Sequence, residues 1–184
     1  MIGRQEEKMG FRAVDTSELF FDDVSVSSKH LMGKKGQGMI LVAAAMESSR
    51  LATASMALGM AETAYEKAFK YAAQRRQFGK PIRNMDAIQF YLADMATQIR
   101  CSDLLIRDAA RLQAQGKRIP KEAAMAKYFT SEMAFRTVSL AMQIHGGCGY
   151  MNDFEIERIF RDVRLCMIIE GTNEIQKKII AQYL

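Results

Sequence analysis

Proline is the residue that most restricts this chain, because only two occur in 184 residues and each stands where a helix can begin. A proline ring is tolerated in the first turn of a helix but disrupts the interior. Pro81 and Pro120 therefore predict two helix starts. The proline-free stretches around them are rich in helix formers and predict three long helices, at about residues 39–74, 85–115 and 121–144.

The three long segments differ in the faces that they offer for packing. The first is crowded with alanine, serine, methionine and glycine, so neighbouring helices can approach it closely on every side. The second and third each carry an apolar stripe at helical spacing. These stripes are formed by Ile88, Leu92, Met95, Ile99, Leu105 and Leu112, and by Phe129, Met133, Leu140 and Ile144.

Two shorter helices complete the predicted set, one near residues 155–161 and one from Asn173 onward. Long antiparallel helices joined by short connections pack as an up-and-down bundle. The predicted fold class is therefore mainly α, an up-and-down four-helix bundle.

The N-terminal residues have a different composition, which is rich in β-branched and aromatic side chains. Ser17–Phe21 and Val24–Val26 read as two strand fragments around the turn Asp22-Asp23. Two short strands do not make a stable sheet by themselves. We therefore predict that residues 1–35 are the end of a β-domain and that residues 36–184 form the helical domain.

Composition and charge exclude several classes of protein. The chain is 49% hydrophobic, which permits a substantial core and excludes a disordered chain. The net charge of +5 is spread among acidic residues rather than gathered on one face, so no nucleic-acid partner is predicted. No apolar stretch has the length of a membrane span, so no membrane partner is predicted either.

The three cysteines, Cys101, Cys148 and Cys166, are odd in number and widely spaced. They suggest neither a disulfide framework nor a metal site, and they indicate a reducing compartment.

A candidate general base lies near the C-terminus, where Glu170 follows an apolar run and precedes Gly171 and Thr172. A carboxylate partly withdrawn from water accepts a proton more readily from a weak acid. Gly171 permits close approach of a substrate to the backbone, and Thr172 is predicted to cap the following helix. The alternative is that an apolar core segment simply meets solvent at Glu170.

A set of short motifs is spread along the whole chain, namely Met9–Arg12, Phe21–Val24, Arg75–Gly79, Lys121–Lys127, Gln143–Tyr150, Glu157-Arg158, Arg161-Asp162 and Glu170–Thr172. In this order and at these separations, the motifs resemble the C-terminal half of the acyl-CoA dehydrogenase family, and most closely its short-chain, butyryl-type branch. The resemblance covers essentially the whole chain.

The resemblance implies FAD-dependent oxidation of an acyl-CoA thioester to a trans-2-enoyl-CoA. Glu170 matches the catalytic base that removes the α-proton while flavin N5 accepts a hydride from the β-carbon. In the family the enolate oxygen is held by the backbone N–H of this glutamate and by a ribityl hydroxyl of the flavin. Such preorganised donors are what a weak carbon acid requires.

The resemblance also implies a set of FAD contacts. Arg75 matches an arginine that reaches the FAD pyrophosphate of a neighbouring subunit. Without the resemblance, an arginine at this position would be interpreted as complementing a helix C-terminus. The other implied cofactor residues are Gln77, Phe78, Gln143, Ile144, Gly146, Gly147, Thr172, Asn173 and Glu174.

For the substrate, Glu47, Arg50 and Gly171 match family positions along the acyl-CoA site. A lone helical arginine such as Arg50 would otherwise be read as part of a surface ion pair. Some relatives place the catalytic carboxylate at the position of Ser49, which leaves Glu170 as the expected base here. The family also implies a homotetramer, an electron-transfer flavoprotein as electron acceptor, and a location in the bacterial cytoplasm or the mitochondrial matrix.

Two positions depart from the family pattern. A flavin-contacting glutamine is replaced by Asp86, and an aromatic residue before the base is replaced by Ile169, which leaves acyl specificity open. His30 and His145 match no catalytic position and are interpreted as structural. We expect these 184 residues to be the C-terminal portion of a longer enzyme and to have little activity alone. Two alternatives stay open: a non-catalytic helical interaction module, and an acyl-CoA oxidase-type flavoenzyme.

Overall fold

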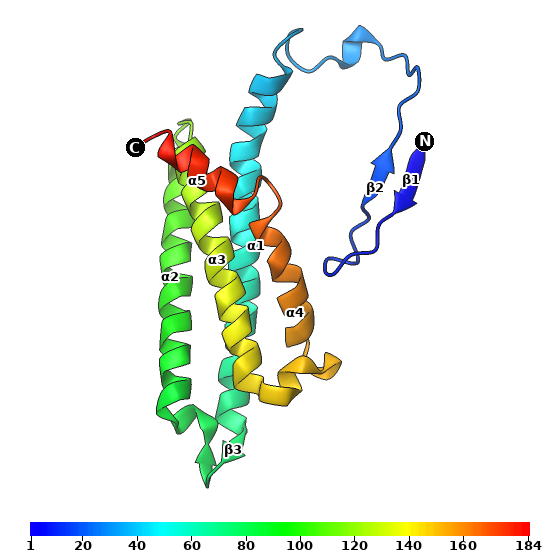
Figure 1. The fold of residues 1–184 in the computed structure, drawn as a ribbon. Helices are drawn as coiled ribbons and strands as arrows, with labels where there is room; N and C mark the ends of the chain where they lie inside the picture. The colour runs from blue at the N-terminus through cyan, green and yellow to red at the C-terminus, as the bar shows by residue number, and fades with distance from the viewer.

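The computed structural model describes residues 1–184 and consists mainly of helices (Figure 1). Three long antiparallel helices run side by side, α1 (Gly38–Gln74), α2 (Asp86–Ala114) and α3 (Pro120–His145). The short helix α4 (Ile156–Val163) packs on α3 and α1, and α5 (Asn173–Ala181) crosses α3 near its N-terminal end. The prediction of a helical bundle is confirmed.

Small residues allow α1 and α3 to pack closely in the centre of the bundle. On α1 the fully buried positions follow one stripe with three- and four-residue steps, namely Ala54, Ala57, Ala61, Ala64, Ala68 and Ala72. The facing surface of α3 is equally small, with Ala123, Ala126, Ala134 and Ala141 also fully buried. Alanine contributes high helix propensity and short side chains, so the two backbones can approach one another.

The connection between α1 and α2 is a tight hairpin. Strand β3 (Arg76–Gln77) pairs with β4 (Lys80–Pro81), and the two turn residues Phe78 and Gly79 have φ values of 51° and 78°. Positive φ at both turn positions suits the right-handed twist of a two-residue hairpin. Pro81 therefore precedes a single 3₁₀ turn, Ile82–Asn84, and α2 begins only at Asp86. Pro120, by contrast, lies at the start of α3 as predicted.

The N-terminal residues form a small antiparallel hairpin beside the bundle. Strand β1 (Ile2–Gln5) pairs with β2 (Ser17–Leu19), so the fragment predicted at Ser17–Phe21 is confirmed in part. The strand predicted at Val24–Val26 is wrong, because that segment has no partner strand and both valines are exposed. Sequence reasoning missed β1, whose glycine, arginine and glutamine give a weak strand signal.

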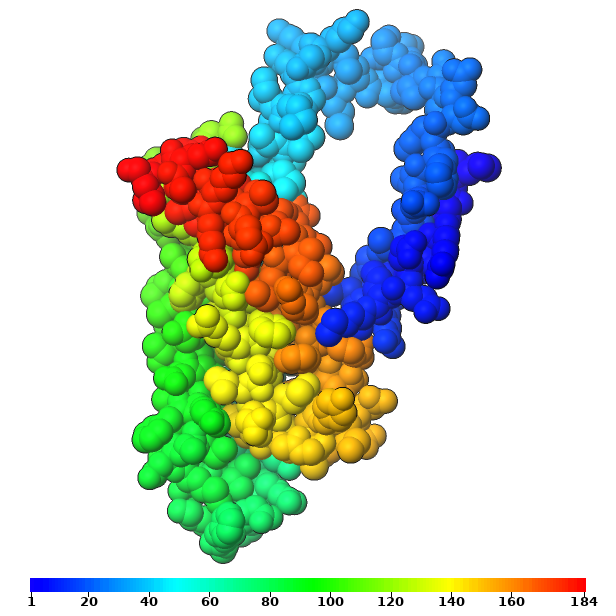
Figure 2. All heavy atoms as spheres, viewed as in Figure 1, coloured from blue at the N-terminus to red at the C-terminus, as the bar shows by residue number.

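The hairpin contacts the bundle only around α4. The backbone N–H of Phe11 donates to Asp162 Oδ1 at 2.6 Å, and Arg161 Nη1 donates to the Met9 oxygen at 2.8 Å. Figure 2 shows the end of the hairpin touching the surface formed by α4, while the segment that leads into α1 stands away from the bundle. No helix combines the length and the apolar character that crossing a membrane requires.

Candidate active site

The predicted site residues gather in two places, near opposite ends of the bundle. One cluster surrounds the turn Glu170-Gly171, between α4 and α5, and the other lies where the C-terminal ends of α1 and α3 meet. Arg50 belongs to the first cluster and Arg75 to the second. The step from Arg50 to Arg75 is 25 residues along α1, which rises by about 1.5 Å per residue, so the two clusters are roughly 37 Å apart along the helix.

Glu170 occupies a turn with an uncommon backbone conformation. Its φ is 57°, and that of Gly171 is 86°. A non-glycine residue at positive φ persists only where the surroundings hold it. Glu170 is half-buried, and its carboxylate takes part in no hydrogen bond or ion pair within the chain. Its backbone N–H also has no hydrogen-bond partner. Both groups are therefore available to a ligand.

Four hydrogen bonds hold the two carbonyl groups of this turn. The Glu170 oxygen accepts from Arg50 Nε at 3.4 Å and from Gln176 Nε2 at 3.1 Å. The Gly171 oxygen accepts from Gln176 Nε2 at 2.7 Å and from Lys127 Nζ at 3.0 Å. A Cβ added to Gly171 would lie 2.9 Å from Gln176 Nε2, so glycine is required for this close approach as well as for its φ.

Arg50 is buried and is not part of a surface ion pair, which makes the ordinary interpretation of a lone helical arginine wrong here. Lys127 and Gln176 are completely buried, and sequence reasoning assigned no role to either. The available signal for Lys127 was a lysine placed among the alanines of a buried helix face.

The side chain of Asn173 faces the protein interior. It is 3% exposed, and its amide oxygen accepts from Lys127 Nζ at 2.9 Å. Its amide nitrogen donates to Glu132 Oε1 at 3.0 Å and to Ser131 Oγ at 3.1 Å. The predicted flavin contact of Asn173 is untested, but its side chain is already fully engaged in joining α5 to α3.

Thr172 stands at the N-cap position of α5, yet its side chain makes no capping hydrogen bond to the helix backbone. The predicted cap is therefore wrong. Glu174 in the first turn is exposed, and its own backbone N–H and the Thr172 hydroxyl lower its pKa. The Thr172 hydroxyl thus interacts with the Glu174 carboxylate and not with the backbone at the helix end.

Glu47, a predicted substrate contact, is committed to another part of the fold. One carboxylate oxygen accepts from Arg118 Nε at 2.7 Å, and the other accepts from the Ile119 N–H at 2.8 Å. Burial raises the pKa of Glu47, but the two hydrogen bonds and the charge of Arg118 outweigh it, and the net pKa is lowered. Its role toward a substrate stays a prediction.

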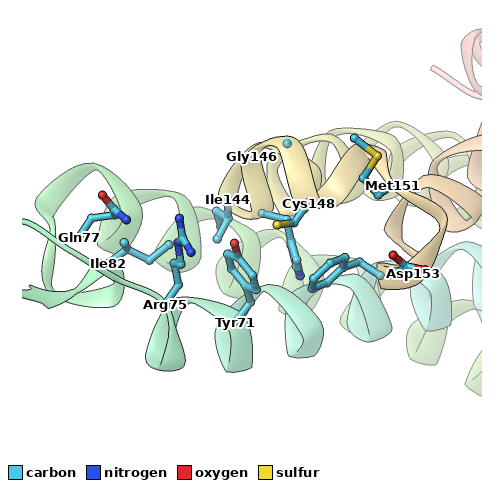
Figure 3. Close-up of a pocket in the computed structure, with 12 residues that line it drawn as sticks. Tyr71, Arg75, Gln77, Ile82, Ile144, Gly146, Cys148, Met151 and Asp153 are labelled. Carbon is cyan, nitrogen blue, oxygen red and sulfur yellow. The ribbon is translucent and has the colours of Figure 1, made fainter.

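The second cluster lines a surface hollow of about 560 Å³ (Figure 3). Tyr71 and Arg75 rise toward it from the α1 side, and Ile144 and Gly146 face them from the end of α3. Five residues predicted to contact FAD meet here, from segments distant in sequence: Arg75, Gln77, Ile144, Gly146 and Gly147. Phe78 and Gln143 lie nearby in sequence but do not line the hollow, and both are exposed.

His145 has the structural role that the sequence suggested. It is 5% exposed, its ring stacks on Tyr71 with centroids 4.4 Å apart, and its Nδ1 bonds the Ala141 oxygen at 2.7 Å. Burial lowers its pKa, which keeps the imidazole neutral. The hollow has further lining residues that sequence reasoning missed, namely Tyr71, Ile82, Cys148, Met151, Asp153 and Phe154.

The hollow suits an anionic, partly aromatic ligand such as FAD. The guanidinium of Arg75 is exposed and has no hydrogen-bond or ion-pair partner within the chain. Gly146 has a φ of 58°, and no other atom lies within 4 Å of where its Cβ would be, so its backbone is open to a ligand. Asp153 on the same rim opposes a phosphate group. The arginine and the open glycine backbone nevertheless fit the pyrophosphate part of the cofactor.

Asp86, the departure from the expected glutamine, is the first residue of α2 and is exposed. A carboxylate at that position is favoured by the helix dipole. It does not line the hollow.

Comparison with known proteins places these features in a family. The sequence model described as "Acyl-CoA dehydrogenase, C-terminal domain" matches residues 36–184. An acyl-CoA dehydrogenase of Bacillus subtilis (strain 168) is 45% identical over 183 residues, covering 100% of this chain and 48% of the relative. The acryloyl-CoA reductase (NADH) of Anaerotignum propionicum is 44% identical over 181 residues, covering 98% of this chain and 46% of the relative.

The fold agrees equally well with a solved structure. Butyryl-CoA dehydrogenase from Megasphaera elsdenii superposes with a TM-score of 0.98 and 38% sequence identity, covering 100% of this chain and 48% of that one. The chain thus spans about half the length of the relatives that it matches. It belongs to the acyl-CoA dehydrogenase family and corresponds to the C-terminal domain of that family with a short segment before it.

Proposed function

We propose that this chain forms the C-terminal half of an FAD-dependent acyl-CoA dehydrogenase, in which Glu170 is the catalytic base. One observation carries this proposal most directly. Glu170 presents an unpaired carboxylate and an unpaired backbone N–H from a single turn, and that turn is fixed by hydrogen bonds to both of its carbonyl groups. A base and an oxyanion donor are the two groups that removal of a proton beside a thioester requires.

The protein groups have distinct tasks in this reaction. The Glu170 carboxylate removes the proton from the carbon next to the thioester carbonyl. The Glu170 N–H donates to the thioester oxygen as negative charge develops there. FAD, when bound, supplies the acceptor for the hydride that leaves the β-carbon, so the thioester loses two electrons and two hydrogens and becomes a trans-2-enoyl-CoA.

The cofactor-binding hollow would act toward a neighbouring copy of the chain. A separation of roughly 37 Å along α1 prevents one chain from presenting Glu170 and Arg75 to the same reacting atoms. We therefore propose a homo-oligomer, most simply the tetramer of the family, in which the arginine and glycines of one subunit complete the FAD site of another. This full-length, FAD-loaded assembly is the holoenzyme, and electron-transfer flavoprotein is its electron acceptor.

A second function is favoured by the reductase among the relatives. Acryloyl-CoA reductase of Anaerotignum propionicum is 44% identical to this chain. The same carboxylate can return a proton to the α-carbon, so one site serves both directions. Reduction of a 2-enoyl-CoA is therefore the alternative reaction.

Neutralising the base tests the proposal. Anaerobic addition of butyryl-CoA to the holoenzyme should bleach the flavin absorbance, and Glu170→Gln should slow this bleaching by about 100- to 10,000-fold, the typical contribution of general base catalysis. The control is Glu62→Gln on α1, because Glu62 is exposed and makes no ion pair. Unchanged bleaching in Glu170→Gln would contradict a role as base and support a non-catalytic helical module.

The direction and the electron partner need separate measurements. Turnover with electron-transfer flavoprotein is expected for the dehydrogenase, reoxidation by oxygen for an oxidase, and consumption of crotonyl-CoA with a reduced donor for the reductase. The fastest of the three at equal enzyme concentration identifies the physiological reaction class.

A further inference from the structure

Lys127 is a buried cation with no carboxylate partner. Its side chain is completely buried in α3, and none of the ion pairs of the chain includes it. Its ammonium bonds only neutral acceptors, the Gly171 oxygen at 3.0 Å and the Asn173 amide oxygen at 2.9 Å. A buried charge without a counter-ion is costly, so packing alone does not explain a lysine at this position.

The acceptors of Lys127 belong to the turn that carries Glu170. Gly171 is the next residue after Glu170, and the Gly171 carbonyl that accepts from Lys127 is the second carbonyl group of this turn. A turn whose φ values are 57° and 86° is strained at its non-glycine residue and persists only where its surroundings hold it. A charge-assisted hydrogen bond from a rigid central helix is a strong way to hold it.

The second acceptor of the Lys127 ammonium, the Asn173 amide oxygen, fixes the direction in which the ammonium points. Asn173 is held in place by Ser131 and Glu132, which lie one turn after Lys127 on the same helix. The ammonium therefore joins α3 to both ends of the short segment between Gly171 and Asn173. Two contacts from one group fix the rotation of the segment as well as its distance from α3.

We propose that Lys127 is a positioning residue for the base: through the Gly171 carbonyl and Asn173 it holds the Glu170 turn in the orientation that reaches the α-proton. This inference rests on the proposed role of Glu170. It assigns Lys127 no contact with the substrate or the cofactor.

Stability and catalysis are expected to respond in opposite directions to loss of the charge. Lys127→Met keeps the length and apolar stem of the side chain but removes the ammonium. Burying a charge without a counter-ion is costly, so its removal is expected not to lower the stability of the fold. The turn, by contrast, loses the hydrogen bond that joins its Gly171 carbonyl to α3. A misplacement of about 1 Å in a catalytic group costs about a hundredfold in rate.

The test compares flavin bleaching by saturating butyryl-CoA in the holoenzyme and in Lys127→Met. We expect the bleaching rate to fall about 10- to 100-fold, with the concentration of butyryl-CoA for half-maximal rate changed less than about twofold, FAD content unchanged and Tm no lower. The matched control is Lys121→Met, the same substitution in the first turn of the same helix, where the rate should stay within about twofold of the original.

Two results would overturn the inference. One is an unchanged bleaching rate in Lys127→Met, and the other is a loss of rate that is matched by loss of FAD or by a lower Tm. Lys127→Gln keeps one donor toward Gly171, so its bleaching rate should fall less than that of the methionine variant. If Lys127→Met does not fold, the bleaching rate of Lys127→Gln is compared with that of the original enzyme instead. Glu170→Gln separates the two hypotheses, because a fully active Glu170→Gln enzyme refutes the base itself, whereas an inactive one beside a fully active Lys127→Met refutes only the positioning role.

Discussion

The carboxylate of Glu47 accepts a hydrogen bond of 2.8 Å from the backbone N–H of Ile119, the residue immediately before α3. This bond satisfies a donor at a helix start that has no side-chain cap of its own. The other carboxylate oxygen pairs with Arg118. A buried acid on α1 thereby fixes the start of α3, the helix that also carries Lys127.

Glu47→Gln should lower the free energy of unfolding of the chain by about 1–3 kcal/mol at pH 7, the range for a hydrogen bond to a charged group. The folded-state pKa of Glu47 lies below its ordinary value of 4.5, so its contribution is present above pH 4.5 and is lost as pH falls through the lowered value. Urea unfolding at pH 7 and pH 3 measures this.

Glu62→Gln is the control, since that exposed carboxylate has no partner. An equal loss of stability at both pH values in Glu47→Gln would contradict the assigned charge pairing.

Arg75→Gln should weaken FAD binding to the holoenzyme by about 10- to 100-fold, because charge-assisted hydrogen bonds to phosphate contribute about 1.5–3 kcal/mol. The neighbouring Arg76 provides the control. It is equally exposed, does not line the hollow, and donates to the Gly79 oxygen of its own hairpin at 3.1 Å. Equilibrium dialysis of FAD against both variants gives the comparison, and equal affinities would remove Arg75 from the cofactor site.

Much of the helical fold could be predicted from local sequence. The helix expected at about 39–74 is found at Gly38–Gln74, and the one expected at about 121–144 is found at Pro120–His145. Helix propensity, the spacing of apolar residues and the position of proline are all properties of residues close together in the sequence. They can therefore be recognised without knowledge of the tertiary structure. The strand β1 was not predicted because its pairing with β2, and not its own composition, makes it a strand.

The site could be predicted only in part for the same physical reason. Motifs identified Glu170, which directly precedes Gly171, and Arg75, which lies at the end of a long helix four residues before Gly79. Lys127 donates to the Gly171 oxygen from α3, and Gln176 donates to the Glu170 and Gly171 oxygens from α5, so neither contact can be derived from the residue pattern around Glu170. The Thr172 cap failed for a local reason, since the residue type favours an N-cap but does not decide whether its hydroxyl interacts with the helix backbone or with the Glu174 side chain.

Gly10→Ala should detach the N-terminal hairpin from the bundle. A Cβ at this position would lie 2.6 Å from the Arg161 oxygen, and backbone atoms cannot move away as a flexible side chain can. The hydrogen bonds of Phe11 to Asp162 and of Arg161 to Met9 should then be lost. Hydrogen exchange of the Phe11 amide should become faster, while exchange within α1 to α3 stays the same.

Gly38→Ala is the control for that substitution, since nothing lies within 4 Å of its added Cβ and the residue opens α1. Unchanged protection of the Phe11 amide in Gly10→Ala would show that the hairpin does not depend on this contact.

Burial lowers the pKa of Lys127 to about 8, from the ordinary 10.5. Between these values the unfolded chain binds more protons at this group than the folded chain does, so the contribution of Lys127 to the free energy of unfolding rises with pH. Cys166 has the opposite sign, because burial raises its pKa to about 11 from 9, and its contribution falls as pH rises through that interval. Both effects occur in the chain with Lys127, but only the second occurs in Lys127→Met.

The difference in unfolding free energy between the original chain and Lys127→Met isolates the lysine. It should shift in favour of the original chain by roughly 1 kcal/mol between pH 7 and pH 9, because the native ammonium loses its proton over this range while the unfolded one keeps it. Urea titrations of both proteins at the two pH values give the difference. A difference that does not change with pH would mean that Lys127 remains charged in the folded protein, as a lysine with a close counter-ion would.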